Sequence, residues 1–417
     1  MLSNENRLLA YSTHIKLSAF ANQDIERLIQ LPLNWAEIVA AASWYGIDPL
    51  LYRCLRDNPA MQQVPQEVMR QLKRAYDDTA IRNMYIYATL SRILPLFTQQ
   101  GIKCIVLKGA MLADTVYDDI GLRPMQDIDL LFNRRDLPHA IALLSDLGYD
   151  HEGSKSPQLY LQDHYHITYT HPDTDIPIEL HWHIAHDRHP PRLRLTDNDL
   201  IEQWIARAQP VTLSQAGGWM LCPADLIFHL CLHFLKHRIP VNGAVFATSA
   251  ALLQLADIVR VIDHFDDRID WNDLDQQASR YQINDLIHTT IKLATEISLD
   301  QEHGDNKSFK GLDGGNRYNR LMFKYLIRHD DMQHPLPYAL RTPVNLRSMR
   351  DVLRGVIKWL LPDRPDLARS YNVPATARRV YVYYLLNPLN LIFTIQLFIR
   401  QLPRLRREIR LNRWIGG

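Results

Sequence analysis

Cysteine is scarce in this sequence, and its spacing shows neither a zinc site nor a disulfide framework. No two cysteines form a C-x-x-C pair, and all are scattered among apolar residues. The four residues are Cys54, Cys104, Cys222 and Cys231. The first residues, MLSNENRLLAYS, are polar and charged, so they lack the apolar stretch of a secretion signal. We therefore expect a cytoplasmic protein whose cysteines are reduced and buried.

The fingerprints of several common enzyme classes are also missing. The sequence contains no Walker A motif and no G-x-G-x-x-G turn of the kind that binds dinucleotides. It contains no G-x-S-x-G nucleophile elbow, and no base can be placed near a cysteine. These absences argue against a P-loop enzyme, a Rossmann dehydrogenase and a hydrolase that uses a serine or cysteine nucleophile.

Net charge is nearly absent, but the charge is unevenly distributed. The formal net charge is +1, whereas residues 341–417 hold 15 Lys and Arg against 4 Asp and Glu. The near-neutral total does not favour a dedicated nucleic-acid binder. The basic tail favours an anionic partner, either a membrane surface or RNA, although a solvated basic surface explains it equally well.

A stretch without charged residues lies inside this tail, at 380–399, and is long enough to cross a bilayer. Polar residues and Pro388 interrupt it, and arginines flank both of its ends, whereas a transmembrane helix usually has a charge bias toward one side. We therefore favour an amphipathic segment that lies on an anionic membrane, which would make the protein peripheral at the membrane. Packing against the protein's own core or a partner is the alternative.

Hydrophobic periodicity predicts an α/β (α+β) fold with four parts. Apolar residues recur at helical spacing up to residue 100 and again after Thr196. Between them, four strand-like runs (IKCIVLKG, DIDLLF, YHITYTHP and IPIELHWHI) are interspersed with two helical runs, the second ended by Gly148. We predict a helical region at 1–100, a small mixed sheet domain at 101–195, a helical C-terminal domain at 196–340 and the basic tail at 341–417. The 47% hydrophobic content is ample for a core.

The strongest chemical signal is the pair Asp127 and Asp129 in the predicted strand DIDLLF. Residues two apart on a strand point to the same face, so both carboxylates project together. Like charges held this close favour a bound cation, and hard oxygen ligands suit Mg²⁺. The D-x-D pattern alone is weak, but Glu179 in IPIELHWHI supplies the third carboxylate that a two-metal phosphoryl-transfer site needs.

Phosphate-binding candidates precede the aspartates. Lys108 and Gly109 lie at a predicted junction between a strand and a helix, where glycine admits a phosphate and the helix N-terminus favours an anion. Lys108 adds a point charge. Arg123, just before the aspartates, is placed to reach a phosphate or to pair with the carboxylates.

Histidines offer a second set of candidates. His181 and His183 follow Glu179 at spacings of two and four, and with the aspartates they suggest a richer site for Mn²⁺ or Zn²⁺; polar contacts beside the site are the simpler interpretation. His229, His233 and His237 recur every four residues along a predicted helix. We name His181, His233, Lys236 and His237 as candidate substrate-binding residues, with helix packing as the alternative for the last three.

The segment LKGAMLADTVYDDIGLRPMQDIDLLF resembles the signature of an uncharacterised nucleotidyltransferase family within the DNA polymerase-beta-like superfamily. The similarity extends over residues 30–300, through ELHW, HLCLHFLKH and ADIVRVID. It implies a polymerase-beta-like fold with Asp127, Asp129 and Glu179 as metal ligands and Lys108 and Gly109 as phosphate contacts. Two features depart from the superfamily pattern: 17 residues separate Gly109 from Asp127, and Ala110 stands where Ser or Gly is expected.

The resemblance also implies a reaction. A nucleoside triphosphate (NTP) would be the donor and Mg²⁺ the cofactor, with Mn²⁺ as the alternative. The acceptor would be a sugar, a peptide or a lipid-linked group in a polysaccharide or modified-peptide pathway. Two other functions stay open: a toxin-like nucleotidyltransferase that modifies tRNA, and a non-catalytic nucleotide-binding scaffold docked to a membrane complex.

Overall fold

The computed structural model describes residues 3–14, 17–152, 156–157, 160–161, 164–185, 191–195, 197–238 and 250–297. The basic tail, including the apolar segment at 380–399, lies outside these residues. The chain divides into two compact units, and the elements below belong to the first, apart from η3 (Pro191–Leu193) and the end of helix α10. Among the described residues, none of the helices combines the length and apolar composition needed to cross a bilayer.

Four short helices open the chain, as the apolar periodicity predicts. Ser3, Ser18 and Asn34 cap three of them, because each side-chain oxygen accepts a hydrogen bond from a backbone N–H in the first turn. Gly46, with φ +70°, ends the third in the left-handed conformation that glycine adopts without strain. The helices are α1 (Asn4–Tyr11), α2 (Ala19–Ile29), α3 (Trp35–Tyr45) and α4 (Asp48–Arg56), followed by the 3₁₀ turn η1 (Pro59–Gln63).

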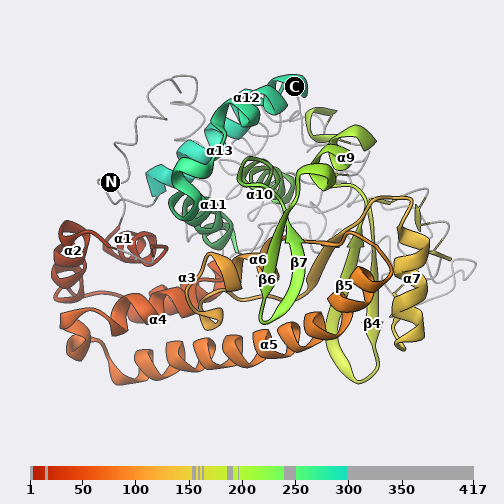
Figure 1. The fold of residues 1–417 in the computed structure, drawn as a ribbon. Helices are drawn as coiled ribbons and strands as arrows, with labels where there is room; N and C mark the ends of the chain where they lie inside the picture. Colours follow the sequence, from red (N-terminus) through yellow and green to blue (C-terminus); the bar gives the residue numbers. More distant parts are fainter. Residues whose placement is uncertain are drawn as a thin grey trace, which may run out of the picture. The chain divides into compact units, whose positions relative to one another are not determined.

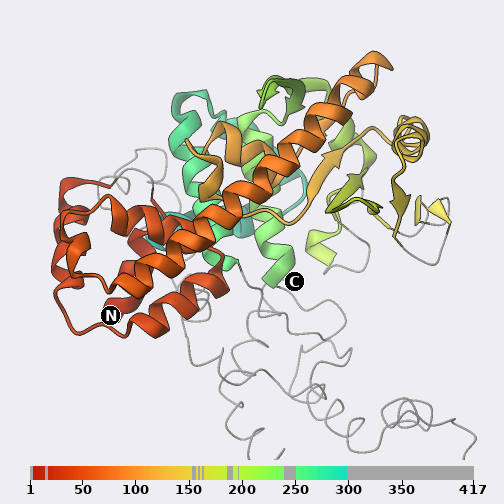
Figure 2. The same cartoon turned by 90° about the horizontal axis from the view of Figure 1, so that it is seen from below.

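A long helix, α5 (Gln66–Gln99), then runs from these helices to the sheet (Figures 1 and 2). Pro65 immediately precedes it, at the N-cap position. Its 34 residues give a length of about 50 Å. This length lets a single helix pack on α4 and, further along, on the elements around the predicted aspartates.

The sheet has seven strands within the described residues, in the order β3-β4-β5-β2-β1-β7-β6 (Figure 1). β2 pairs in parallel with β5, β1 pairs antiparallel with β2 and parallel with β7, and the remaining neighbours are antiparallel. The mixed α/β prediction is therefore confirmed. The strands are β1 (Ile105–Val106), β2 (Ile128–Leu131), β3 (Asp150–His151), β4 (His166–His171), β5 (Thr174–His181), β6 (Gln209–Leu213) and β7 (Ala216–Met220).

Helices separate the first strands much as expected. α6 (Lys108–Thr115) follows β1 in the place of the first predicted helical run, and the 3₁₀ turn η2 (Ile120–Leu122) follows it. α7 (Leu137–Asp146) ends before Gly148, whose φ of +86° confirms the predicted helix end. α6 packs on β2, the strand that carries Asp129.

The chain after Thr196 differs from the uniformly helical prediction. Residues 209–220 form the β6–β7 hairpin, and β7 pairs with β1 near the middle of the sheet. The remaining elements are helical: α9 (Asn198–Arg207), α10 (Pro223–Arg238), α11 (Ala251–Phe265), η5 (Asp266–Arg268), α12 (Trp271–Arg280) and α13 (Asn284–Ile297). The strands that complete the sheet thus come from the start of the region predicted as a helical C-terminal domain.

Candidate active site

Two parallel strands bring three carboxylates together. Asp129 on β2 lies directly beside Glu179 on β5, and Asp127 immediately precedes β2. One ligand oxygen from each residue lies within 4.8 Å of the other two. Ile128 and Leu130, which alternate with the aspartates, are fully buried. The alternation of a strand therefore separates the apolar core from the acidic cluster.

Asp127 and Asp129 have pKa values shifted in opposite directions. Burial and the neighbouring charge of Asp129 raise the pKa of Asp127 to about 6. Asp129 is also buried, but the charge of Lys108 and a hydrogen bond from His181 hold its pKa well below the usual range. The cluster thus has negative charge that its own cations do not fully compensate, and a divalent cation would do so.

Lys108 supplies the nearest cation. Its Nζ lies 2.7 Å from Asp129 Oδ1, and both side chains are almost completely buried. Burial lowers the pKa of Lys108, but the charges of Asp129, Asp127 and Glu179 outweigh this effect and raise it. Its backbone has φ +47°, a conformation that costs a non-glycine residue free energy and that clusters at functional sites. The strand-to-helix turn thus holds the ammonium group at the edge of the acidic cluster.

His181 contacts two of the carboxylates. Its Nε2 lies 2.8 Å from Asp129 Oδ1 and 3.1 Å from Glu179 Oε2. Burial lowers the pKa of His181, but these two hydrogen bonds outweigh burial and raise it. Burial raises the pKa of Glu179, but the hydrogen bond from His181 and the charge of this ring outweigh burial and lower it. His181, predicted as a substrate contact, therefore belongs to the acidic cluster itself.

The histidine that accompanies His181 is His166 on β4, which sequence reasoning did not select. His166 lies directly opposite His181 in the β4–β5 register, with ring centroids 5.1 Å apart. Burial and the charge of His181 lower the pKa of His166 to about 4, so this ring is neutral at pH 7. His183, the expected companion, lies beyond the end of β5 and joins no potential metal cluster among the described residues.

Gly109 and Arg123 touch each other next to the turn. A Cβ at position 109 would lie 2.5 Å from Arg123 Nη1 and 2.9 Å from Met125 Cγ, so only glycine fits. Arg123 is buried and donates to Asp257 on α11 through Nε (3.1 Å) and Nη2 (2.7 Å). Tyr117 donates to the same carboxylate at 2.6 Å. The structure therefore places Arg123 in a bidentate ion pair, beside the turn that carries Lys108.

The remaining candidates lie on α10. His233 Nδ1 is 3.4 Å from Gln254 Nε2, and the His233 ring stacks on His229 at a centroid distance of 6.4 Å. Lys236 is half-buried and His237 is exposed. The structure thus puts the histidine stripe on one helix as predicted, while the carboxylates come from β2 and β5. A substrate-binding role for these residues stays a prediction.

Helix α5 anchors both segments that carry the site, a role that its sequence did not reveal. Asn83 Nδ2 donates to the carbonyls of Ile120 and Arg123. Arg82 donates to the next two carbonyls before Asp127, those of Met125 and Gln126. Tyr87 Oη donates to the carbonyl of Ala110 at 2.8 Å. The loop before Asp127 and the first turn of α6 are therefore both fixed to one rigid helix.

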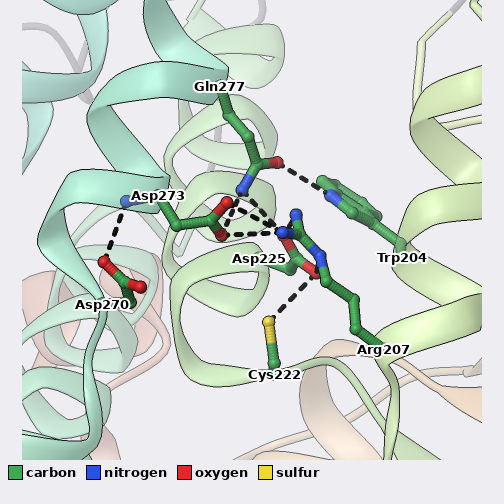
Figure 3. Close-up of polar contacts among 7 residues, drawn as sticks. All are labelled: Trp204, Arg207, Cys222, Asp225, Asp270, Asp273 and Gln277. Carbon is green, nitrogen blue, oxygen red and sulfur yellow. Dashed lines mark hydrogen bonds and ion pairs between the residues drawn. The ribbon is translucent and has the colours of Figure 1, made fainter.

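A second group of potential metal ligands, Cys222, Asp225 and Asp273, has a different character (Figure 3). Arg207 donates to both carboxylates, at 2.5–3.0 Å from Asp225 and 2.8–2.9 Å from Asp273. Gln277 Nε2 also donates to both. Because these donors compensate the carboxylates, this group is an ion-pair network that joins α9, α10 and α12.

Comparison with known families agrees with the geometry. The sequence model of a family described as "uncharacterised nucleotidyltransferase" matches residues 32–298. The matched stretch includes the Lys108 turn, the three carboxylates, His166 and His181. No curated protein matches the chain.

Proposed function

This chain belongs to the uncharacterised nucleotidyltransferase family, and we propose that it transfers a nucleotidyl group from an NTP to an acceptor hydroxyl or phosphate, with release of pyrophosphate. The observation that carries this proposal is the grouping of Asp127, Asp129 and Glu179 on adjacent strands, with ligand oxygens within 4.8 Å of one another. Phosphoryl transfer depends mainly on positioning and charge neutralisation, and this cluster can provide both.

The three carboxylates fit a hard divalent cation. All the ligand atoms are carboxylate oxygens. Burial and the charge of Asp129 raise the pKa of Asp127, and a cation would compensate that charge. We propose Mg²⁺ as this cation, with Mn²⁺ as the alternative. Asp127 and Asp129 would hold it, and Glu179 would complete its ligands. Such an ion, when bound, neutralises charge on the transferring phosphate.

The residues around the carboxylates receive distinct roles. Lys108, whose Nζ already lies at the edge of the cluster, would contact the triphosphate together with the backbone at Gly109. The acceptor oxygen would attack the α-phosphorus, and the bond to the bridging oxygen of the pyrophosphate would break. Glu179 would orient the acceptor and take its proton. Arg123, engaged by Asp257, would position the turn from behind.

The acceptor and the location are proposed on sequence grounds. We propose a sugar, a peptide or a lipid-linked group as the acceptor, with the basic tail attached to an anionic membrane. Vesicles containing anionic lipid should bind the full chain, and replacing Arg404, Arg406, Arg407 and Arg410 with serine should weaken that binding. Equal binding by both proteins would remove the membrane from the proposal.

The decisive experiment is calorimetric titration of ATP, GTP, CTP and UTP in the presence of Mg²⁺. The wild type should bind one of them, and the Asp127→Asn/Asp129→Asn double variant should lose binding by at least about a hundredfold, as expected when a metal's principal ligands are removed. Asp146→Asn, an exposed aspartate at the end of α7, is the control and should behave as wild type. Equal binding by the double variant would refute the proposed site.

A further inference from the structure

Two imidazoles and a carboxylate meet at the β4–β5 hairpin, beside the proposed magnesium ligands. His166 extends from β4, and Glu179 and His181 extend from β5. Their ligand atoms lie within 4.8 Å of one another. Glu179 belongs to both clusters, whereas His166 belongs to this one alone. We call these three residues the imidazole cluster.

The separations within the imidazole cluster are close to those of a coordinated ion. His181 Nε2 lies 3.1 Å from Glu179 Oε2, and His166 Nε2 lies 3.9 Å from Glu179 Oε1. Ligands at 2.0–2.2 Å from a tetrahedral zinc ion are about 3.3–3.6 Å apart, which follows from the bond lengths and the tetrahedral angle. The two imidazoles lie within 4.8 Å of each other at their ligand atoms, so side-chain shifts of up to about 1 Å would form the site.

The surroundings of His166 indicate that this side chain binds an ion. Its Nδ1 is buried and has no hydrogen-bond partner in the part of the chain that the structure describes. Its Nε2 faces Glu179 Oε1 at 3.9 Å, which is too long for a hydrogen bond. Within the described residues the ring therefore makes no hydrogen bond through either nitrogen, which is uncommon for a buried side chain. Nε2 is the nitrogen that faces Glu179, so an ion bound there would give the ring a polar partner, while Nδ1 would keep its proton.

We propose that the imidazole cluster is a second cation site, which binds a divalent transition-metal ion of the zinc class next to the Mg²⁺ ligands. Imidazole nitrogen suits Zn²⁺, whereas Mg²⁺ prefers oxygen ligands. Two histidines and one carboxylate leave a coordination position open, as in catalytic zinc sites. The inference rests on the proposed function only in that Glu179 would serve as a ligand of both ions.

The test is calorimetric titration of the full chain with Zn²⁺ alone, without nucleotide. Wild type should bind one ion tightly, and His166→Gln should weaken this binding by at least about a hundredfold, because even the loss of an outer-shell partner costs about 10- to 100-fold. The control is His139→Gln, an exposed histidine on α7, which should retain wild-type affinity. Unchanged affinity in His166→Gln, or a loss that His233→Gln produces instead, would overturn the proposal.

A second variant guards against misfolding of His166→Gln. His166→Cys keeps a ligand at this position, so its complex with Co²⁺ should show the near-ultraviolet charge-transfer absorption of a thiolate, which the wild-type complex should lack. Absence of this band in a variant with a wild-type circular dichroism spectrum would contradict the site. Because Zn²⁺ is titrated without nucleotide, wild type that binds Zn²⁺ but no NTP would retain this site and reject the proposed function.

Discussion

At the scale of single residues, the acidic cluster follows from two local rules. Alternation along a strand places Asp127 and Asp129 on one side and Ile128 and Leu130 in the core. The parallel register then puts Glu179 beside Asp129. This arrangement is locally unfavourable, because it raises the pKa of Asp127 and places Lys108 at a positive φ angle. Residues that conflict locally with stability are typical of functional sites.

Gly109 gives the sharpest test at this scale. Its Cβ in Gly109→Ala would collide with Arg123 Nη1, which cannot retreat because Asp257 holds the guanidinium. We expect a loss of about 1–3 kcal/mol in the free energy of unfolding, as for other overpacked sites. Urea denaturation measures it. Gly217→Ala, where an added Cβ meets open space, is the control and should change stability far less.

His166 shows how far sequence reasoning could have gone. The runs YHITYTHP and IPIELHWHI were predicted as consecutive strands, and pairing them as a hairpin puts His166 on the same face as Glu179 and His181. The bulge between Tyr169 and His171 moves the register by two residues, which preserves that face. The strand pattern therefore contained enough information to select His166. The partner of Arg123 is different: Asp257 lies 134 residues away, and no local pattern identifies it.

At the scale of elements, the β6–β7 hairpin explains the main difference from prediction. Ser214 and Gln215 form its two-residue loop with positive φ angles of 46° and 78°. Such turns usually carry Asn-Gly or Asp-Gly, so the usual hairpin signal is missing. Gly217 and Gly218 further weaken the strand pattern. Gly218 nevertheless suits β7, because an added Cβ would lie 3.3 Å from Leu94 Cδ1 on α5.

Helix α5 provides the second prediction. In Asn83→Ala, the carbonyls of Ile120 and Arg123 would lose their buried donor, which should lower the free energy of unfolding by about 1–3 kcal/mol. The loop before Asp127 should also loosen, so metal-dependent nucleotide binding should weaken by more than the stability loss explains. Calorimetry at a temperature where the variant is folded separates the two effects. Met84→Ala, an exposed neighbour on α5, should leave both unchanged.

The network around Arg207 gives the third prediction (Figure 3). Arg207→Met would leave the fully buried Asp225 and the half-buried Asp273 without their shared cation. We expect a loss of about 3 kcal/mol, at the lower end of the range for broken buried pairs because Arg207 itself is one-third exposed.

Arg280→Met is the control for this network. Arg280 pairs with Asp197 and Asp199 at an exposed position, where such ion pairs contribute at most about 1 kcal/mol. Equal losses of stability in the two variants, measured by denaturation, would mean that the Arg207 network does not hold α9, α10 and α12 together.

At the scale of the whole molecule, the ion pair of Arg123 and Asp257 joins segments that the sequence keeps far apart. Arg123 lies between η2 and β2, next to the Lys108 turn, and Asp257 lies on α11. Arg260, also on α11, stacks over Tyr117 at 4.2 Å and donates to the carbonyl of Thr13 near the chain's start. Helix α11 therefore holds the segment that carries Arg123, next to the proposed active site.

The last prediction concerns this support. Asp257→Asn would leave Arg123 buried without a counter-charge, and we expect a loss of about 3–5 kcal/mol in the free energy of unfolding. Asp267→Asn, an exposed aspartate just after α11, should cost almost nothing. Adding Arg123→Met to Asp257→Asn removes the unpaired charge, so the double variant should be more stable than Asp257→Asn alone.

If nucleotide binding by this double variant stays weak while its stability recovers, Arg123 acts by positioning the Lys108 turn. If binding recovers as well, the ion pair serves only the fold, and phosphate binding depends on Lys108 and Gly109 without it.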